Sequence, residues 1–175
     1  MNKLPMLLLV TLFIGGCSSK ISLQEYFVSK AEDGNFLIVN IPASALGIAH
    51  DSLSKSDQEV LESFHKLNIL AYKANPEKPE LMEQELHTIR SIINIPPYEE
   101  LMAVKDKRLS GKIIVVGKDT DLEEVVFFGQ SPQAGFVLAR VLGDQMSTKK
   151  VAQLTALMQE ENVDPKVFAG LQKFF

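Results

Sequence analysis

The residues that could carry out nucleophilic or acid–base chemistry are few and scattered. His50 and Asp51 are adjacent, and three serines lie close to them in the chain, at Ser44, Ser52 and Ser54. A serine–histidine–aspartate hydrolase is therefore one alternative. However, the closest match to the Gly-x-Ser-x-Gly turn of many hydrolases is Gly-Gln-Ser-Pro-Gln at 129–133, which fails at its last position. The sequence thus favours a non-catalytic protein over a periplasmic enzyme whose site residues are dispersed.

Metal-binding patterns are equally weak. The histidines at positions 50, 65 and 87 show no metal-ligand spacing, and we expect solvated surface positions for them. The segment 119–124, Asp-Thr-Asp-Leu-Glu-Glu, begins like a calcium loop, but Glu124 replaces the required glycine and Gln130 the final glutamate. We interpret this segment as a polar hairpin turn, and we expect no metal and no other cofactor.

Cys17 carries the most specific chemical signature in the chain. It is the only cysteine, and it follows Lys3, an apolar run and the small pair Gly15-Gly16. This is the order of a bacterial export signal. The Gly-Gly-Cys boundary resembles the lipobox of bacterial lipoproteins. That resemblance implies a cleaved signal peptide and a Cys17 that carries several acyl chains, such as palmitate, as the first residue of the mature chain.

The lipobox divides the chain into three parts. We expect a signal peptide at 1–16, a lipidated tether at 17–21 and one globular domain at 22–175. The apolar run before Cys17 is shorter than the roughly 20 residues of a membrane span, so lipid is the expected membrane anchor. Ser18 is not aspartate and no acidic run follows. By resemblance to other lipoproteins, these features imply the periplasmic face of the outer membrane.

The composition argues against nucleic-acid partners. The net charge is −4, tryptophan is absent and only three tyrosines are present. A mildly acidic chain with few aromatic residues lacks both the basic surface and the stacking platforms that nucleic-acid binding uses.

The spacing of apolar residues predicts an α+β fold. Helices are expected at 23–32, from Pro79 to about position 95, and from Thr148 onward. A further helix is expected to start at a capping box at Ser56 and to place Val60, Phe64 and Leu67 on one face. Strands are expected at 36–41, 68–73, 98–106, 112–118, 123–129 and 136–142. Residues 98–102 also fit one helical turn. Together these segments predict a mostly antiparallel sheet of about six strands with helices mainly on one face.

The C-terminal residues predict one more short helix. Asp164-Pro165 is a helix start, and Val167, Leu171 and Phe174 then share one face. Two alternatives remain for this apolar face, which either packs on the domain's own core or stays exposed as a docking patch.

Three segments resemble one known family. They are Phe36–Pro42, Tyr98–Asp106 with its Tyr-Glu-Glu-Leu-Met block, and Leu142–Met146. They resemble the lipoprotein family called domain of unknown function 4252, whose members are typical of Bacteroidetes, and the resemblance covers roughly 23–158. The family has no established activity or catalytic residues, so the resemblance implies no site. Its genes often neighbour sigma-factor systems, which implies a link to envelope regulation.

These observations predict a membrane-anchored envelope lipoprotein that acts as a binding or interaction module for an envelope protein partner. The alternatives are a hydrolase and a carrier of a small apolar ligand. A shallow apolar patch would favour the interaction module, and a large apolar cavity between sheet and helices would favour the carrier. An enclosed polar cleft with a histidine and a carboxylate would favour the enzyme.

Overall fold

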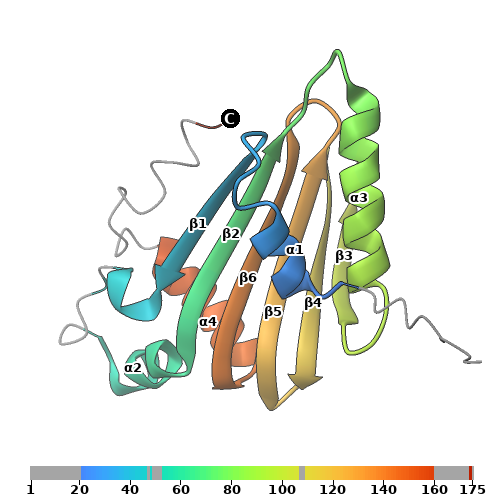
Figure 1. The fold of residues 1–175 in the computed structure, drawn as a ribbon. Helices are drawn as coiled ribbons and strands as arrows, with labels where there is room; N and C mark the ends of the chain where they lie inside the picture. The colour runs from blue at the N-terminus through green and yellow to red at the C-terminus, as the bar shows by residue number, and fades with distance from the viewer. Residues whose placement is uncertain (1–20, 47, 49–52, 107–108, 160–173, 175) are drawn as a thin grey trace, which may run out of the picture.

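The protein is built around one six-stranded sheet. The computed structural model describes residues 21–46, 48, 53–106, 109–159 and 174. The strands lie in the order β1-β2-β6-β5-β4-β3, and all neighbours are antiparallel (Figure 1). They are β1 (Phe36–Pro42), β2 (Phe64–Lys73), β3 (Glu99–Lys105), β4 (Ser110–Lys118), β5 (Asp121–Ser131) and β6 (Gly135–Met146). Strands β3 to β6 form the predicted meander.

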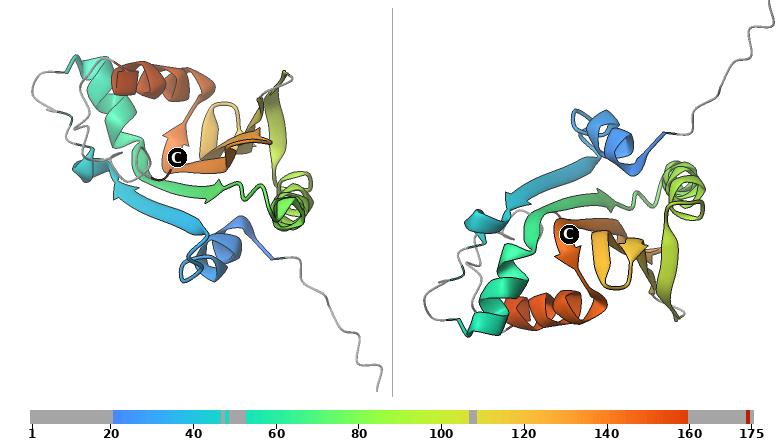
Figure 2. Two further views of the ribbon diagram at one scale, coloured as in Figure 1. Left: turned by 90° about the horizontal axis from the view of Figure 1, so that it is seen from above. Right: turned by 90° about the horizontal axis from the view of Figure 1, so that it is seen from below.

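The helices are divided between the two faces of the sheet. Helices α1 (Leu23–Ser29) and α3 (Pro79–Ile93) cover one face, and α2 (Lys55–Glu62) and α4 (Thr148–Gln159) pack on the other (Figure 2). A short 3₁₀ helix, η1 (Ala43–Ala45), follows β1. The α+β class and the six-stranded antiparallel sheet are confirmed, whereas the helices do not gather mainly on one face as expected.

Two separate cores explain this division. The α1/α3 face buries Leu70, Ile114 and Leu138, while the α4 face buries Val115 and Val141. Because successive residues of a strand point to opposite faces, a strand with a continuous apolar run needs cover on both. Val115 and Leu138 are both buried. Ile38 is only partly buried, since β1 is an edge strand.

Helix α1 begins at Leu23, as predicted, behind a capping box at Ser22, and ends earlier than predicted. The Glu25 carboxylate accepts the Ser22 backbone N–H at 2.6 Å, and the Ser22 hydroxyl accepts the Glu25 N–H at 3.2 Å. At the other end, the Ser29 hydroxyl donates to the Tyr26 carbonyl at 2.8 Å and competes with helical hydrogen bonding. The predicted continuation to residue 32 is therefore wrong, and Ala31 is exposed.

Helix α2 starts two residues earlier than predicted and is shorter than predicted. Its N-cap is Ser54, whose hydroxyl accepts the Asp57 N–H at 3.2 Å, so Ser56 lies inside the helix. The predicted helical stripe through Phe64 and Leu67 is wrong, because both residues belong to β2. The Ser63 carbonyl accepts the Asp144 N–H at 3.0 Å, and this contact joins the chain to β6 as soon as the helix ends.

The later elements follow the prediction closely. Helix α3 starts at Pro79, and residues 99–105 form a strand, which excludes the helical turn considered for 98–102. Helix α4 is capped by Ser147, not by Thr148, since the Ser147 hydroxyl accepts the Lys150 N–H at 3.2 Å. Apart from Phe174, the helix predicted from Asp164 lies outside the described residues. None of the described helices is long and apolar enough to cross a bilayer.

Candidate interaction surface

The serine–histidine–aspartate hypothesis finds no support in the residues that the structure describes. Cys17, His50, Asp51 and Ser52 lie outside them. Ser44 lies in η1, and the Ser54 hydroxyl is engaged with Asp57 at the start of α2.

One histidine does lie beside a carboxylate. His65 Nε2 is 3.6 Å from Asp144 Oδ2, and with Ser63 they line a shallow polar cavity of about 410 Å³. The side chains of His65 and Asp144 are 53% and 80% exposed, so water solvates both. The Ser63 hydroxyl donates to the Val60 carbonyl at 2.8 Å. This is not the enclosed cleft that an enzyme would need. The solvated positions predicted for His65 and, on α3, His87 are confirmed.

The segment that resembles a calcium loop begins with the hairpin turn between β4 and β5, at Asp119 and Thr120, and continues as the start of β5. Its Asp119 carboxylate accepts a hydrogen bond from the Thr148 hydroxyl, which fixes the turn to the start of α4. Glu124 points away from the turn and pairs with Arg140. Within the described residues, no group of three or more His, Cys, Asp or Glu could hold a metal ion.

A buried polar cluster joins α1 to the sheet. Arg140 on β6 and Glu124 on β5 are 8% and 7% exposed, and they form two hydrogen bonds of 2.6 and 2.9 Å. Arg140 also donates to the Gln24 side chain of α1 at 2.5 Å. A buried ion pair needs such additional partners because both ions lose their hydration.

Two further residues border this cluster. Asn68 lies opposite Arg140 in the register and is 2% exposed; among the described residues its Oδ1 has no hydrogen-bond partner. Burial, reinforced by the negative charge of Glu124, raises the pKa of Tyr98 to about 12. Since β-strands and α1 close around these groups, we interpret the cluster as structural.

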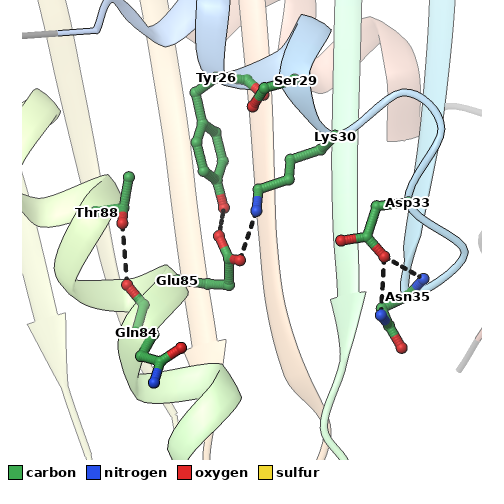
Figure 3. A network of polar contacts seen from close by, with 8 residues as sticks. All are labelled: Tyr26, Ser29, Lys30, Asp33, Asn35, Gln84, Glu85 and Thr88. Atoms are coloured by element: carbon green, nitrogen blue, oxygen red, sulfur yellow. Dashed lines mark hydrogen bonds and ion pairs between the residues drawn. The ribbon is translucent and has the colours of Figure 1, made fainter.

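A second polar contact fixes α1 to α3. Figure 3 shows the Glu85 carboxylate accepting hydrogen bonds from the Tyr26 hydroxyl at 2.8 Å and from Lys30 Nζ at 2.5 Å. Burial and the bond to Glu85 raise the pKa of Tyr26, so the phenol stays protonated. The Lys30 ammonium also lies 5.0 Å from the centre of the Phe36 ring. These contacts hold the helix and offer no open site.

The other face of the sheet carries an apolar surface that α4 covers only in part. In Figure 1, α4 lies behind the lower part of the sheet. The register places four residues in one cross-strand row, Met102, Ile113, Phe127 and Ala139, and four in the next row, Val104, Gly111, Gly129 and Val137. We call these eight residues the open face.

The open face contains a hollow. Gly111 and Gly129 are directly paired in the middle of the second row. A Cβ added at Gly129 would meet no atom within 4 Å, so the space above it is empty. A cavity of about 370 Å³ follows this row, and a second of about 300 Å³ lies where the first row meets α4. Both are shallow and apolar, which matches the patch expected for an interaction module.

The β3 edge of the open face carries exposed apolar side chains. Seven large hydrophobic side chains of the described residues are exposed, and four of them lie on β3 or in the turn after it. They are Leu101, Met102, Val104 and Leu109, with exposed fractions of 48%, 51%, 54% and 56%. Exposed apolar side chains that cluster mark contact sites more often than scattered ones do.

The sequence profile of one protein family matches residues 26–154 of this chain. The chain belongs to the DUF4252 family. The description of this family is "domain of unknown function", and the match runs from α1 into α4, so it spans the complete sheet. The resemblance noted from three short segments is thereby confirmed. Neither curated proteins nor solved structures give a match to this chain.

A larger cavity lies on the opposite face of this DUF4252 chain. It has a volume of about 500 Å³, opens to solvent between the start of α3 and the β3–β4 end of the sheet, and is lined by Met82, Leu86, Leu109, Lys105 and Gln130 among others. Gln130 is held in place there, because its side chain donates to Ser110 at 2.8 Å and accepts from Arg90 at 3.3 Å. A volume of this size is typical of small-molecule sites.

Sequence reasoning missed the open face of the DUF4252 domain. A glycine within a strand often marks a bulge or a close approach. Gly111 preceded the expected strand 112–118 and Gly129 ended the expected strand 123–129, so neither stood inside a strand where it would give this signal. Only the register shows that the two glycines are paired and that the hollow exists.

Proposed function

We propose that this DUF4252 protein is a lipid-anchored envelope lipoprotein that acts as a non-catalytic interaction module for another envelope protein. Its anchor is Cys17 with its acyl chains, at the periplasmic face of the outer membrane. The Gly-Gly-Cys boundary supports the anchor, and the family membership supports a source in Bacteroidetes and a link to envelope regulation.

The open face is the observation that carries this proposal. Its rows are apolar, its centre is hollow at Gly111 and Gly129, and its edge residue Val104 is 54% exposed. Such a surface fits a protein that inserts an apolar side chain between Phe127 and Val137. Burial of apolar area provides the affinity, at about 25 cal/mol per Å².

A photo-crosslinking side chain at position 104 tests this proposal in the native membrane. We expect a crosslink to a partner protein of defined mass from position 104 and none from position 28, since Val28 is 64% exposed on α1 and far from the open face. Gly129→Val fills the hollow where the added Cβ meets no atom. It should abolish the crosslink without unfolding the chain.

The matched control is Gly34→Ala, which is equally free of contacts but lies in a turn. Equal crosslinking in wild type and Gly129→Val would show that the open face is not the binding surface. Crosslinking to lipid alone would identify the face as a membrane contact.

Lipidation is tested separately with a clickable fatty acid. Wild type should carry the label and sediment with the membranes, whereas Cys17→Ala should carry none and leave the membrane fraction. An unlabelled wild-type chain would contradict the lipoprotein assignment but not the interaction module.

The 500 Å³ cavity beside α3 supports a second candidate, a carrier of a small apolar ligand. Met82, Leu86 and Leu109 supply apolar lining. Mass spectrometry of ligands extracted from the purified protein distinguishes this candidate, because a carrier retains a stoichiometric small molecule. Leu86 is buried in the core, so Leu109→Gln, at a half-exposed position, is the suitable variant to reduce retention.

A further inference from the structure

Among the described residues, no strand pairs with the outer edge of β3, and the sequence of this edge is complementary to itself. Strand β3 is the last strand of the sheet, and every residue from Glu99 to Lys105 is exposed. A free edge presents unpaired N–H and C=O groups that can pair with another strand. Natural edges are usually protected by charges, prolines or bulges. Here Lys105 and a bulge at Glu100/Met102 provide such protection. They prevent most strands from pairing with β3, but not a strand whose charges and bulge are complementary to those of β3.

The faces of the β3 side chains determine which strand matches. Met102 and Val104 lie on the α4 face, because they are paired with Ile113 and Gly111 of the open face. Ala103 and Lys105 lie on the α3 face, and so does Glu100, which is paired with Ile114. Leu101 is the extra residue of the bulge.

We propose that β3 pairs antiparallel with β3 of a second copy of this chain, about a two-fold axis at Ala103. Directly opposite residues must share a face. This register places Met102 against Val104 of the other copy, and Lys105 against Glu100 of the other copy, with Leu101 bulged between. The charge pair occurs twice, once at each end of the paired segment, which makes the edge complementary to itself.

The pairing also covers the apolar edge. Both copies contribute their half-exposed Met102 and Val104 side chains to the same face, so four apolar side chains lose contact with water. The two sheets become continuous and their open faces adjoin. This inference concerns the backbone edge, and it stands whether or not the open face binds another protein.

A cysteine at the axis tests the register in the full chain in its own membrane. Opposite Cβ atoms in an antiparallel pair lie about 4.5–5.5 Å apart, close to the reach of a disulfide. Ala103→Cys should therefore give a covalent dimer under mild oxidation. The controls are wild type, whose only cysteine is Cys17, and Val28→Cys, an exposed position on α1. Failure of Ala103→Cys to crosslink, or equal crosslinking by Val28→Cys, would overturn the proposal.

Charge exchange provides a second, independent test. Glu100→Lys alone and Lys105→Glu alone each place like charges opposite one another at both ends of the dimer. Each should weaken self-association by about tenfold in sedimentation equilibrium. A mixture of the two variants restores opposite charges at both ends and should recover the affinity.

Recovery in the mixture excludes misfolding as the reason for the loss. It also separates the effect from the contact between Glu100 and Lys112 of the same chain, 2.6 Å apart, which the mixture does not repair. Monomeric wild type, or a mixture as weak as the single variants, would refute self-pairing. Gly129→Val should leave the dimer intact, so failure of the open-face proposal remains distinguishable.

Discussion

The buried pair Arg140–Glu124 predicts a large and specific stability loss for Glu124→Gln. The substitution keeps the shape of the side chain and removes its charge. Among the described residues, Arg140 is then a buried cation at 8% exposure whose hydrogen-bond partners are neutral, Gln24 among them. Leaving one ion of a buried pair uncompensated costs about 3–5 kcal/mol, a large part of the roughly 5–15 kcal/mol that stabilises a domain.

Urea denaturation measures this loss. Because the chain has no tryptophan, far-UV circular dichroism is the suitable signal. With a slope of about 2 kcal/mol per M, the midpoint should fall by about 1.5–2.5 M. Glu123→Gln is the matched control, since Glu123 is the exposed neighbour on the same strand. This substitution should change the free energy of unfolding by less than about 0.5 kcal/mol.

The double variant Glu124→Leu/Arg140→Met isolates the reason for the loss. It removes both ions, and replacing a buried pair by apolar residues is often neutral, so most of the stability should return. A Glu124→Gln protein as stable as the Glu123→Gln control would refute the reasoning, because it would mean that water or another group already compensates Arg140.

Three further predictions concern the core, the tyrosines and the glycines. Leu138→Ala, at a fully buried position, should destabilise the fold by about 2–5 kcal/mol in the same urea assay. The pKa of Tyr98 is raised from 10.0 to about 12. The protonated phenol therefore contributes its full stabilisation below pH 10, and this stabilisation is lost as the pH rises from 10 to 12. In pH-dependent denaturation, Tyr98→Phe should lose less stability over this interval. Gly135→Ala should lower the melting temperature, because φ is +120° and the new Cβ would lie 1.9 Å from the Tyr72 carbonyl oxygen, whereas Gly129→Ala should leave it unchanged.

Most elements could be predicted because their side chains repeat with one period. Helix α3 is the clearest case, since Met82, Leu86 and Ile89 recur at helical spacing and all are buried. Prediction failed at the junction of α2 and β2. Val60, Phe64 and Leu67 also repeat at helical spacing, yet the hydrogen bond from the Asp144 N–H to the Ser63 carbonyl ends the helical segment. A contact from a distant strand therefore decides the boundary, and local spacing cannot reveal it.

The division of the helices between the two faces of the sheet could not be predicted from the sequence for a related reason. A run such as Ile113–Val116 is apolar at every position, so it indicates a strand buried on two sides but does not show which helix covers which side. That assignment follows from the strand order. Strand β6 inserts between β2 and β5 and brings α4 behind the sheet.

The candidate functional residues also differ in whether the local sequence is enough to predict them. Cys17 is recognised from its immediate neighbours in the sequence, which is sufficient because processing enzymes read a short linear segment. The open face and the Arg140–Glu124 pair depend on register instead. Arg140 lies opposite Val126 and Glu124 lies opposite Leu142, so the regular β5–β6 register places the carboxylate diagonally across from the guanidinium. One residue of slip would turn Glu124 to the α4 face, among apolar side chains. The ion pair therefore favours the β5–β6 register that also places Gly129 opposite Val137, and the stability of the buried cluster helps to maintain this part of the open face.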